Sequence, residues 1–167
     1  MSAPAGPLGP MMALLDVGVL VALFDPAHIH HEMAHAWLDE SRSRGWATCP
    51  VSENGFARVV AHPDYPGRRS TVADALARLQ AFTESGDHHF WPDSTSLRRA
   101  SRFDAGRLEG HGQITAAYLL LLAVHHGGRF VTFDPELAPE VVPAARPEQL
   151  VVLGARSRPL ASERRTQ

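Results

Sequence analysis

Short apolar segments of two different periods alternate along this chain of 167 residues. Continuous apolar runs are typical of buried strands, and they alternate with segments whose apolar residues recur at helical spacing, separated by Gly, Pro and Asp. We expect strands over residues 12–15, 46–51, 88–91, 129–133 and 150–153, and helices over residues 19–24, 28–44, 53–62, 71–84, 94–103 and 114–126. Strands and helices in this order form a parallel sheet covered by helices. The sequence therefore predicts an α/β fold with a central parallel sheet flanked by helices.

Pro50 and Ser52 mark the end of the second expected strand. Proline cannot donate to a strand ladder, so Pro50 confines this segment to the end or the edge of a sheet. We expect Ser52 to cap the following helix, because a serine hydroxyl accepts hydrogen bonds from the N–H groups of a first helical turn.

The length and composition of the chain fit one domain. A chain of 167 residues is long enough for a single core, and its content of 44% hydrophobic and 20% charged residues is that of a globular protein. No apolar stretch approaches the roughly 20 residues of a membrane span, and the lone Cys49 fits a cytoplasmic protein without disulfides. We expect a flexible leader over residues 1–11, the domain over residues 12–153 and a disordered basic tail over residues 154–167.

Three acidic residues follow the ends of expected strands. Asp16 and Asp134 each close an apolar run, and Glu53 begins a helix just after the second strand. The carboxyl ends of parallel strands lie along one edge of a sheet, where ligands bind. Clustered carboxylates repel one another unless a cation neutralises them, and their oxygen atoms suit Mg²⁺ or Mn²⁺. The sequence therefore predicts a divalent-metal site, with helix capping or solvation of each acid as the alternative.

The charge of the chain says little about nucleic acid. A formal net charge of -2 gives no general attraction to a polyanion, so any phosphate binding has to come from local arginines or from a bound cation. Arg58, Arg68 and Arg69 lie near Glu53 in the sequence and are candidates for phosphate contacts, although a solvated surface position is the simpler role for each.

A second metal motif lies in the expected helix over residues 28–44. His31, Glu32 and His35 form the pattern H-E-x-x-H, in which two imidazoles on one helical face bind zinc and the glutamate acts as a base. A zinc metalloprotease, with Glu53 as a third ligand, is therefore an alternative function. The competing interpretation is a solvated, histidine-rich first turn of a packing helix.

Four segments that occur in series carry a resemblance to a known family. They are LLDVGVLVALFDPAHIHHEMAHAWL at residues 14–38, WATCPVSENGFARVVAHP at residues 46–63, FWPD at residues 90–93 and GHGQITAAYLLLLAVHHGGRFVTFDPEL at residues 110–137. Over residues 12–153 the chain resembles the PIN-domain ribonucleases (VapC) of bacterial VapBC toxin–antitoxin systems. The resemblance implies a parallel sheet flanked by helices, an acidic Mg²⁺-dependent site that hydrolyses RNA, a homodimeric toxin and a small antitoxin of the VapB type that masks the site.

The resemblance also assigns roles to single residues. Asp16 matches the first acid of the family, Glu53 the second and Asp134 the acid that follows the late strand. The resemblance therefore implies that these three residues are catalytic and bind the metal ion.

Two positions depart from the family pattern. Val17-Gly18 stands where the family usually has Thr-Asn, and Ala116 stands where the helix usually carries its third acid, in a Thr-Asp-Ala-Tyr sequence. Because Mg²⁺ often keeps several waters and needs only one or two carboxylates, the remaining acids are sufficient to bind it. We expect an endoribonuclease with weakened or lost activity. The alternative is a catalytically inactive PIN domain that binds RNA or an antitoxin.

Overall fold

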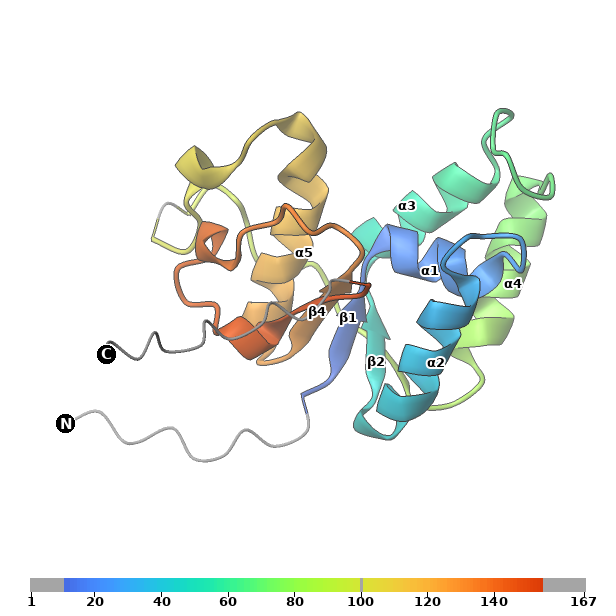
Figure 1. Ribbon diagram of the computed structural model, residues 1–167, viewed down its shortest axis with the longest axis horizontal. Coiled ribbons are helices and arrows are strands. Elements are labelled where there is room, and N and C mark those ends of the chain that lie inside the picture. The colour runs from blue at the N-terminus through green and yellow to red at the C-terminus, as the bar shows by residue number, and fades with distance from the viewer. Residues whose placement is uncertain (1–10, 100, 155–167) are drawn as a thin grey trace, which may run out of the picture.

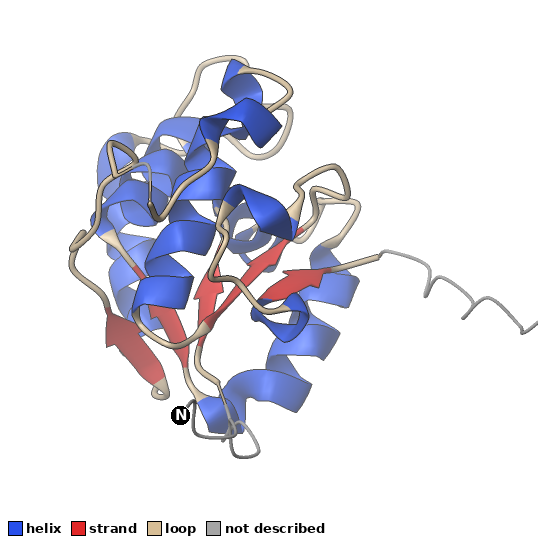
Figure 2. Cartoon of the chain, turned by 90° about the vertical axis from the view of Figure 1, so that its left-hand side faces the viewer, coloured by secondary structure: helices blue, strands red, loops and turns tan. Residues whose placement is uncertain are grey.

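Five parallel strands form one sheet in the computed structural model, which describes residues 11–99 and 101–154 (Figure 1). The strands are β1 (Ala13–Leu15), β2 (Trp46–Thr48), β3 (His88–Phe90), β4 (Arg129–Thr132) and β5 (Leu150–Val152). Their order in the sheet is β3-β2-β1-β4-β5, and every neighbouring pair is parallel (Figure 2). The predicted α/β class is confirmed. Because the chain builds outward from β1 in both directions, the order reverses between β1 and β4, and ligands bind at such a reversal.

Helices cover both faces of this sheet. They are α1 (Val17–Phe24), α2 (His31–Ser41), α3 (Pro50–Val60), α4 (Val72–Thr83) and α5 (Ile114–His125). Figure 1 shows α5 on one side of the strands and α1, α2 and α4 on the other. The two faces therefore form two separate apolar layers.

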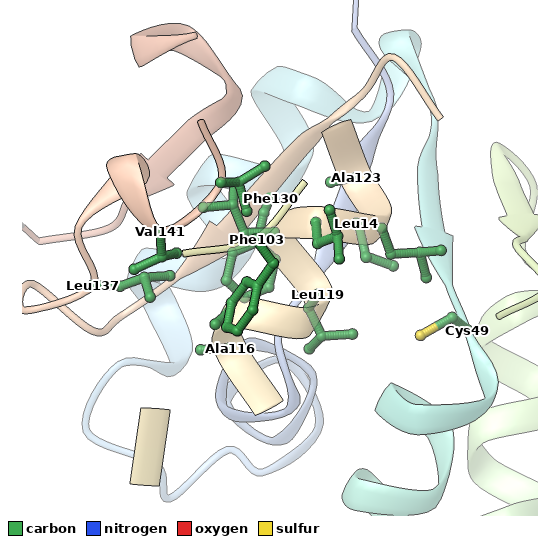
Figure 3. Packing of buried hydrophobic residues seen from close by; sticks show 14 of the residues in the cluster. Leu14, Cys49, Phe103, Ala116, Leu119, Ala123, Phe130, Leu137 and Val141 are labelled. Carbon is green, nitrogen blue, oxygen red and sulfur yellow. The ribbon is translucent and has the colours of Figure 1, made fainter. Parts of the chain in front are cut away.

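The strands are buried on both faces because alternate side chains point into alternate layers. Leu14 and Phe130 pack with α5 in one cluster, drawn in Figure 3, whereas their neighbours Leu15 and Val131 pack with the other helices. Helix α5 is apolar on nearly every side, as the sequence predicted for a buried helix. Its buried residues are Ala116, Ala117, Leu119, Leu120, Leu121, Leu122 and Ala123.

The start of α3 differs from the expectation. Strand β2 ends at Thr48 and lies inside the sheet, and Pro50 opens α3 instead of ending the strand. Proline suits this position because the first N–H groups of a helix have no partner within the helix. Cys49 is the N-cap, and Ser52 closes a capping box by accepting from the Cys49 N–H at 2.9 Å.

The helix expected over residues 94–103 was wrong. The described residues of this segment form turns and irregular backbone. Ser96 gives a physical reason, because its hydroxyl oxygen accepts the backbone N–H of Arg98 at 3.3 Å and so competes with helical hydrogen bonding.

Two further expectations concern membrane spans and the two ends of the chain. Among the described residues, no helix is long and apolar enough to cross a bilayer. The described strands and helices run from Ala13 to Val152. Residues 1–10 and 155–167, which make up all but one residue of the expected leader and of the expected tail, lie outside the described residues, so these two boundaries stay predictions.

Candidate active site at the end of the sheet

A pocket of about 710 Å³ opens at the carboxyl ends of β1 and β4, where the strand order reverses. Asp16 follows β1, Asp134 lies two residues beyond the end of β4, and both carboxyl groups line the pocket. Residues of α3 and of the loop after it form one part of the wall, and the start of α5 forms another. Two acids from strands that are distant in sequence therefore meet in one cavity, as the sequence predicted.

Thr132 connects the two acids. Its hydroxyl donates to Oδ2 of Asp16 at 2.6 Å and accepts the backbone N–H of Asp134 at 3.1 Å. The other carboxylate oxygen of Asp16 accepts the N–H of Val17 at 2.8 Å, so that Asp16 is the N-cap of α1. The Asp16 carboxylate is thus held on both oxygens before any ligand binds.

Burial and a neighbouring charge affect the ionisation of Asp16. Burial raises the pKa of Asp16 above its ordinary value, and the negative charge of Asp134 raises it further. The hydrogen bonds from Thr132 and Val17 act in the opposite direction because they stabilise the carboxylate. A cation between Asp16 and Asp134 would neutralise their repulsion and favour the ionised form.

The donor set fits a hard divalent ion. Asp16 and Asp134 supply carboxylate oxygens, and Mg²⁺ is usually bound through one or two carboxylates together with waters. Within the described ranges, no group of three or more His, Cys, Asp or Glu side chains is placed to hold a metal ion. The protein therefore offers such an ion two carboxylates in the conformation described.

Glu53 lies outside the set of residues that line this pocket. Its carboxylate accepts the hydroxyl of Thr48 at 2.6 Å, and Nε2 of His88 lies 2.8 Å from the same hydroxyl oxygen. Because the single Thr48 proton goes to Glu53, His88 is the donor to Thr48. The structure therefore brings together two of the three predicted acids, and the catalytic and metal-binding role of Glu53 stays a prediction.

Asp16 and Glu53 are held from opposite faces of the sheet, by Thr132 and Thr48 respectively. Thr132 shares its strand face with Phe130, which packs in the layer of α5, whereas Thr48 shares its face with Trp46 in the other layer. Sequence reasoning missed both threonines. The signal that was present is that each is the last residue of a strand and precedes an acid by two to five positions.

Comparison with known proteins identifies the family. The family model for the PIN domain matches residues 13–139. The chain belongs to the PIN domain family. It is 46% identical to "Ribonuclease VapC44" of Mycobacterium tuberculosis over 143 residues, which cover 86% of this chain and all of the relative. It is also 42% identical to "Ribonuclease VapC39" of the same organism over 128 residues, covering 77% of this chain and 92% of the relative. This PIN domain is thus of the VapC type, as the resemblance indicated.

The missing third acid of this PIN domain maps to the pocket wall. Ala116 lies in the first turn of α5, lines the pocket and is 8% exposed. The neighbouring Thr115 is exposed and lines the same pocket. An aspartate at position 116 would therefore add its carboxylate to the cavity that holds Asp16 and Asp134.

The H-E-x-x-H pattern of this PIN domain does not form a zinc site. Nδ1 of His31 lies 2.8 Å from the carbonyl oxygen of Ala22, and Nε2 of His35 lies 2.7 Å from that of Leu23. A carbonyl oxygen only accepts, so these two nitrogens carry protons. Among the described residues, no third His, Cys, Asp or Glu side chain is placed to complete a metal site with the opposite ring nitrogens. The two histidines bond carbonyl groups in the last turn of α1 that have no partner within that helix. The zinc hypothesis is therefore corrected to a structural role.

Proposed function

We propose that this PIN domain is an endoribonuclease that hydrolyses RNA phosphodiester bonds at the pocket of Asp16 and Asp134, as the toxin of a type II toxin–antitoxin pair. The observation that carries the proposal is the preorganised pair of carboxylates at the reversal of strand order. Relatives named ribonuclease VapC, which this chain covers over nearly their whole length, support the choice of RNA as the substrate.

The chemistry requires a divalent cation, for which Mg²⁺ and Mn²⁺ are the candidates. When bound, such an ion lowers the pKa of a water molecule and stabilises the charge that develops on the phosphate. Asp16 and Asp134 would hold the ion through their carboxylate oxygens. Thr132 and the N–H of Val17 orient Asp16 and favour its ionised form, which is the form that binds a cation. The protein therefore contributes position and charge, with little rearrangement of Asp16.

Ala116 favours a second candidate function. Because no third acid is grouped with Asp16 and Asp134 in the described residues, the pocket lacks a ligand for a second ion, which would stabilise the leaving oxygen. We therefore infer weakened cleavage. The second candidate is an inactive PIN domain that binds RNA or an antitoxin through the same cavity.

The proposed partners follow from the same pocket. A small antitoxin of the VapB type would insert a basic side chain between the two carboxylates, where a charge-assisted hydrogen bond is strong. A homodimer and a cytoplasmic location belong to the same proposal. Copurification with the product of an adjacent small open reading frame tests the antitoxin partner, and light scattering tests the homodimer.

Cleavage of total RNA by the purified protein with Mg²⁺ or Mn²⁺ tests the function, with Asp16→Asn and Ala116→Asp measured in parallel. We expect slow cleavage that is lost in Asp16→Asn and accelerated in Ala116→Asp. Activity that appears only in Ala116→Asp would support the inactive binding domain instead. Cleavage that persists at full rate in Asp16→Asn would show that the nuclease activity does not reside in this pocket.

A further inference from the structure

Arg58 lines the same pocket from the last turn of α3 and is exposed. Among the residues that the structure describes, it makes no ion pair and its guanidinium makes no hydrogen bond, although three acids line the same cavity. By contrast, Arg42, Arg107 and Arg146 each pair with a neighbouring carboxylate. Arg58 therefore offers the pocket a full set of donors.

His62 adds a second donor to this part of the wall. It follows Arg58 by four residues and also lines the pocket. Its Nδ1 accepts the backbone N–H of Asp64 at 3.1 Å, so the proton of the neutral ring resides on Nε2. The backbone hydrogen bond thus fixes the tautomer that donates.

Charge distinguishes this part of the wall from the rest. Arg58 and His62 are the two basic side chains among the residues described as lining the pocket, while Asp16, Asp64 and Asp134 are acidic. A polyanion entering the cavity meets repulsion from the carboxylates, and the chain as a whole carries a net charge of -2. Attraction for a phosphate has to come from the side of α3, or from a cation held by the acids.

We propose that Arg58 and His62 form a phosphate-binding subsite for the RNA backbone, adjoining the two acids. This inference rests on the proposed ribonuclease function and names the residues that position its substrate. A guanidinium matches the geometry of a phosphate group through two parallel N–H donors, and Nε2 of His62 supplies a further one. The acids then hold the cation and the α3 wall holds the backbone, so that the scissile phosphate is positioned between them.

The two parts of the pocket suit different occupants. A basic antitoxin side chain is matched to Asp16 and Asp134, whereas Arg58 and His62 are matched to the phosphates of a nucleic-acid strand. An RNA strand is therefore the occupant that the charges of the α3 wall favour.

Binding is tested apart from cleavage in the Asp16→Asn protein with Mg²⁺. Fluorescence anisotropy follows a fluorescein-labelled single-stranded RNA of mixed sequence and about ten nucleotides, a length within the usual site sizes. On this background we compare Arg58→Gln, Arg58→Lys, His62→Ala and the matched control Arg69→Gln. Arg69 carries the same charge, is exposed and does not line the pocket.

We expect Arg58→Gln to weaken RNA binding about tenfold, because it removes the positive charge and the paired N–H donors to the phosphate. The slope of log K against log salt should fall by about 0.7, the value for one lost phosphate contact on a single strand. Arg58→Lys should keep the slope and bind with intermediate affinity, because the charge remains without the planar fork. His62→Ala should weaken binding without changing the slope as much, and Arg69→Gln should leave both quantities unchanged.

Two failures are distinguishable. If the parent protein binds RNA and Arg58→Gln behaves as Arg69→Gln does, the subsite is wrong while the proposed function stands. If the Asp16→Asn protein binds no RNA and the wild type cleaves none, the ribonuclease proposal fails and the subsite fails with it. Thermal unfolding of Arg58→Gln checks that the fold is intact, which the exposure of Arg58 leads us to expect.

Discussion

Thr132 donates its hydroxyl proton to Asp16 across the β1–β4 pair, at an oxygen–oxygen distance of 2.6 Å. Thr132 is fully buried at the end of β4 and pairs with Val152 of β5. The same oxygen accepts the backbone N–H of Asp134, so one buried hydroxyl sets the placement of both acids. The chemistry of the pocket therefore depends on a residue that does not itself line it.

Replacement of Thr132 by Val tests this dependence. Without the hydroxyl, Asp16 loses a donor that stabilises its ionised form, so the pKa of Asp16 rises further. We expect cleavage to fall about tenfold and the acidic limb of its pH profile to move to higher pH, with a loss of about 1–2 kcal/mol in unfolding free energy. Thr132→Ser keeps the hydroxyl and should keep the pH profile. A Val variant with the pH profile of the wild type would show that the hydrogen bond does not tune Asp16.

Asp16 itself predicts a dependence of stability on pH. Burial raises its pKa in the folded protein. A carboxyl whose pKa is raised by folding stabilises the folded state while it is protonated, and this contribution is lost as the pH rises through the folded-state pKa. Asp16→Asn, which still caps α1 well, should therefore be more stable than the wild type at neutral pH. Urea denaturation at several pH values should show the difference shrinking as the pH falls toward the ordinary value for aspartate.

Added Mg²⁺ or Mn²⁺ should reverse the order of stability of the wild type and Asp16→Asn. An ion that binds only the folded state adds about 2.7 kcal/mol of stability at a concentration of about 100 Kd. We expect this gain in the wild type, a larger one in Ala116→Asp and little in Asp16→Asn, measured as shifts in thermal unfolding. Na⁺ at matched ionic strength is the control. Equal shifts in the wild type and Asp16→Asn would mean that the ion binds elsewhere.

The sequence predicted the sheet and two of the acids because both depend on local patterns. Apolar runs buried on two faces identify the strands, and a carboxylate at the end of a parallel strand is placed by the sheet itself. The position of the Glu53 carboxylate could not be predicted. Its hydrogen bonds run to Thr48 of β2 and through Thr48 to His88 of β3. A side chain on the first turn of α3 is able to turn toward either face of the sheet. Such a choice is made by tertiary contacts, which leave no periodic signal.

The H-E-x-x-H pattern misled for a related reason. The spacing predicted that His31 and His35 lie on one face of a helix, and the centroids of their rings do lie 4.4 Å apart. The pattern did not contain the carbonyl groups of α1 that these rings bond, because these carbonyls lie nine and twelve residues away. We predict that His35→Ala lowers the free energy of unfolding by about 1 kcal/mol. The protein should contain no stoichiometric zinc before or after the substitution.

Urea denaturation and elemental analysis check this prediction. His111→Ala is the control, because His111 is exposed in the short turn that precedes α5. A stoichiometric zinc ion that is lost in His35→Ala would restore the zinc-site hypothesis. If His35→Ala is as stable as His111→Ala, the proposed structural role of His35 is wrong.

The close approach of α1 and α3 gives a final prediction at Gly55. A Cβ atom at this position would lie 2.5 Å from Cγ2 of Val17, the residue that follows Asp16. Val17 is β-branched and has little freedom to move away. We expect Gly55→Ala to cost about 1–3 kcal/mol of stability, in the range of overpacked cores, and to reduce cleavage because a shift of Val17 carries its N–H away from the Asp16 carboxylate.

A double-mutant cycle separates this contact from the ordinary effect of adding a methyl group to a helix. Val17→Ala removes the two γ-methyl groups that the new Cβ would meet, so the Val17→Ala/Gly55→Ala protein should recover most of the lost stability and cleavage. The coupling energy should be at least about 1 kcal/mol, since contacting residues couple by about 0.5–3 kcal/mol. Additive effects would place the cost of Gly55→Ala outside the α1–α3 contact. Recovery of stability without recovery of cleavage would show that Asp16 does not depend on the position of Val17.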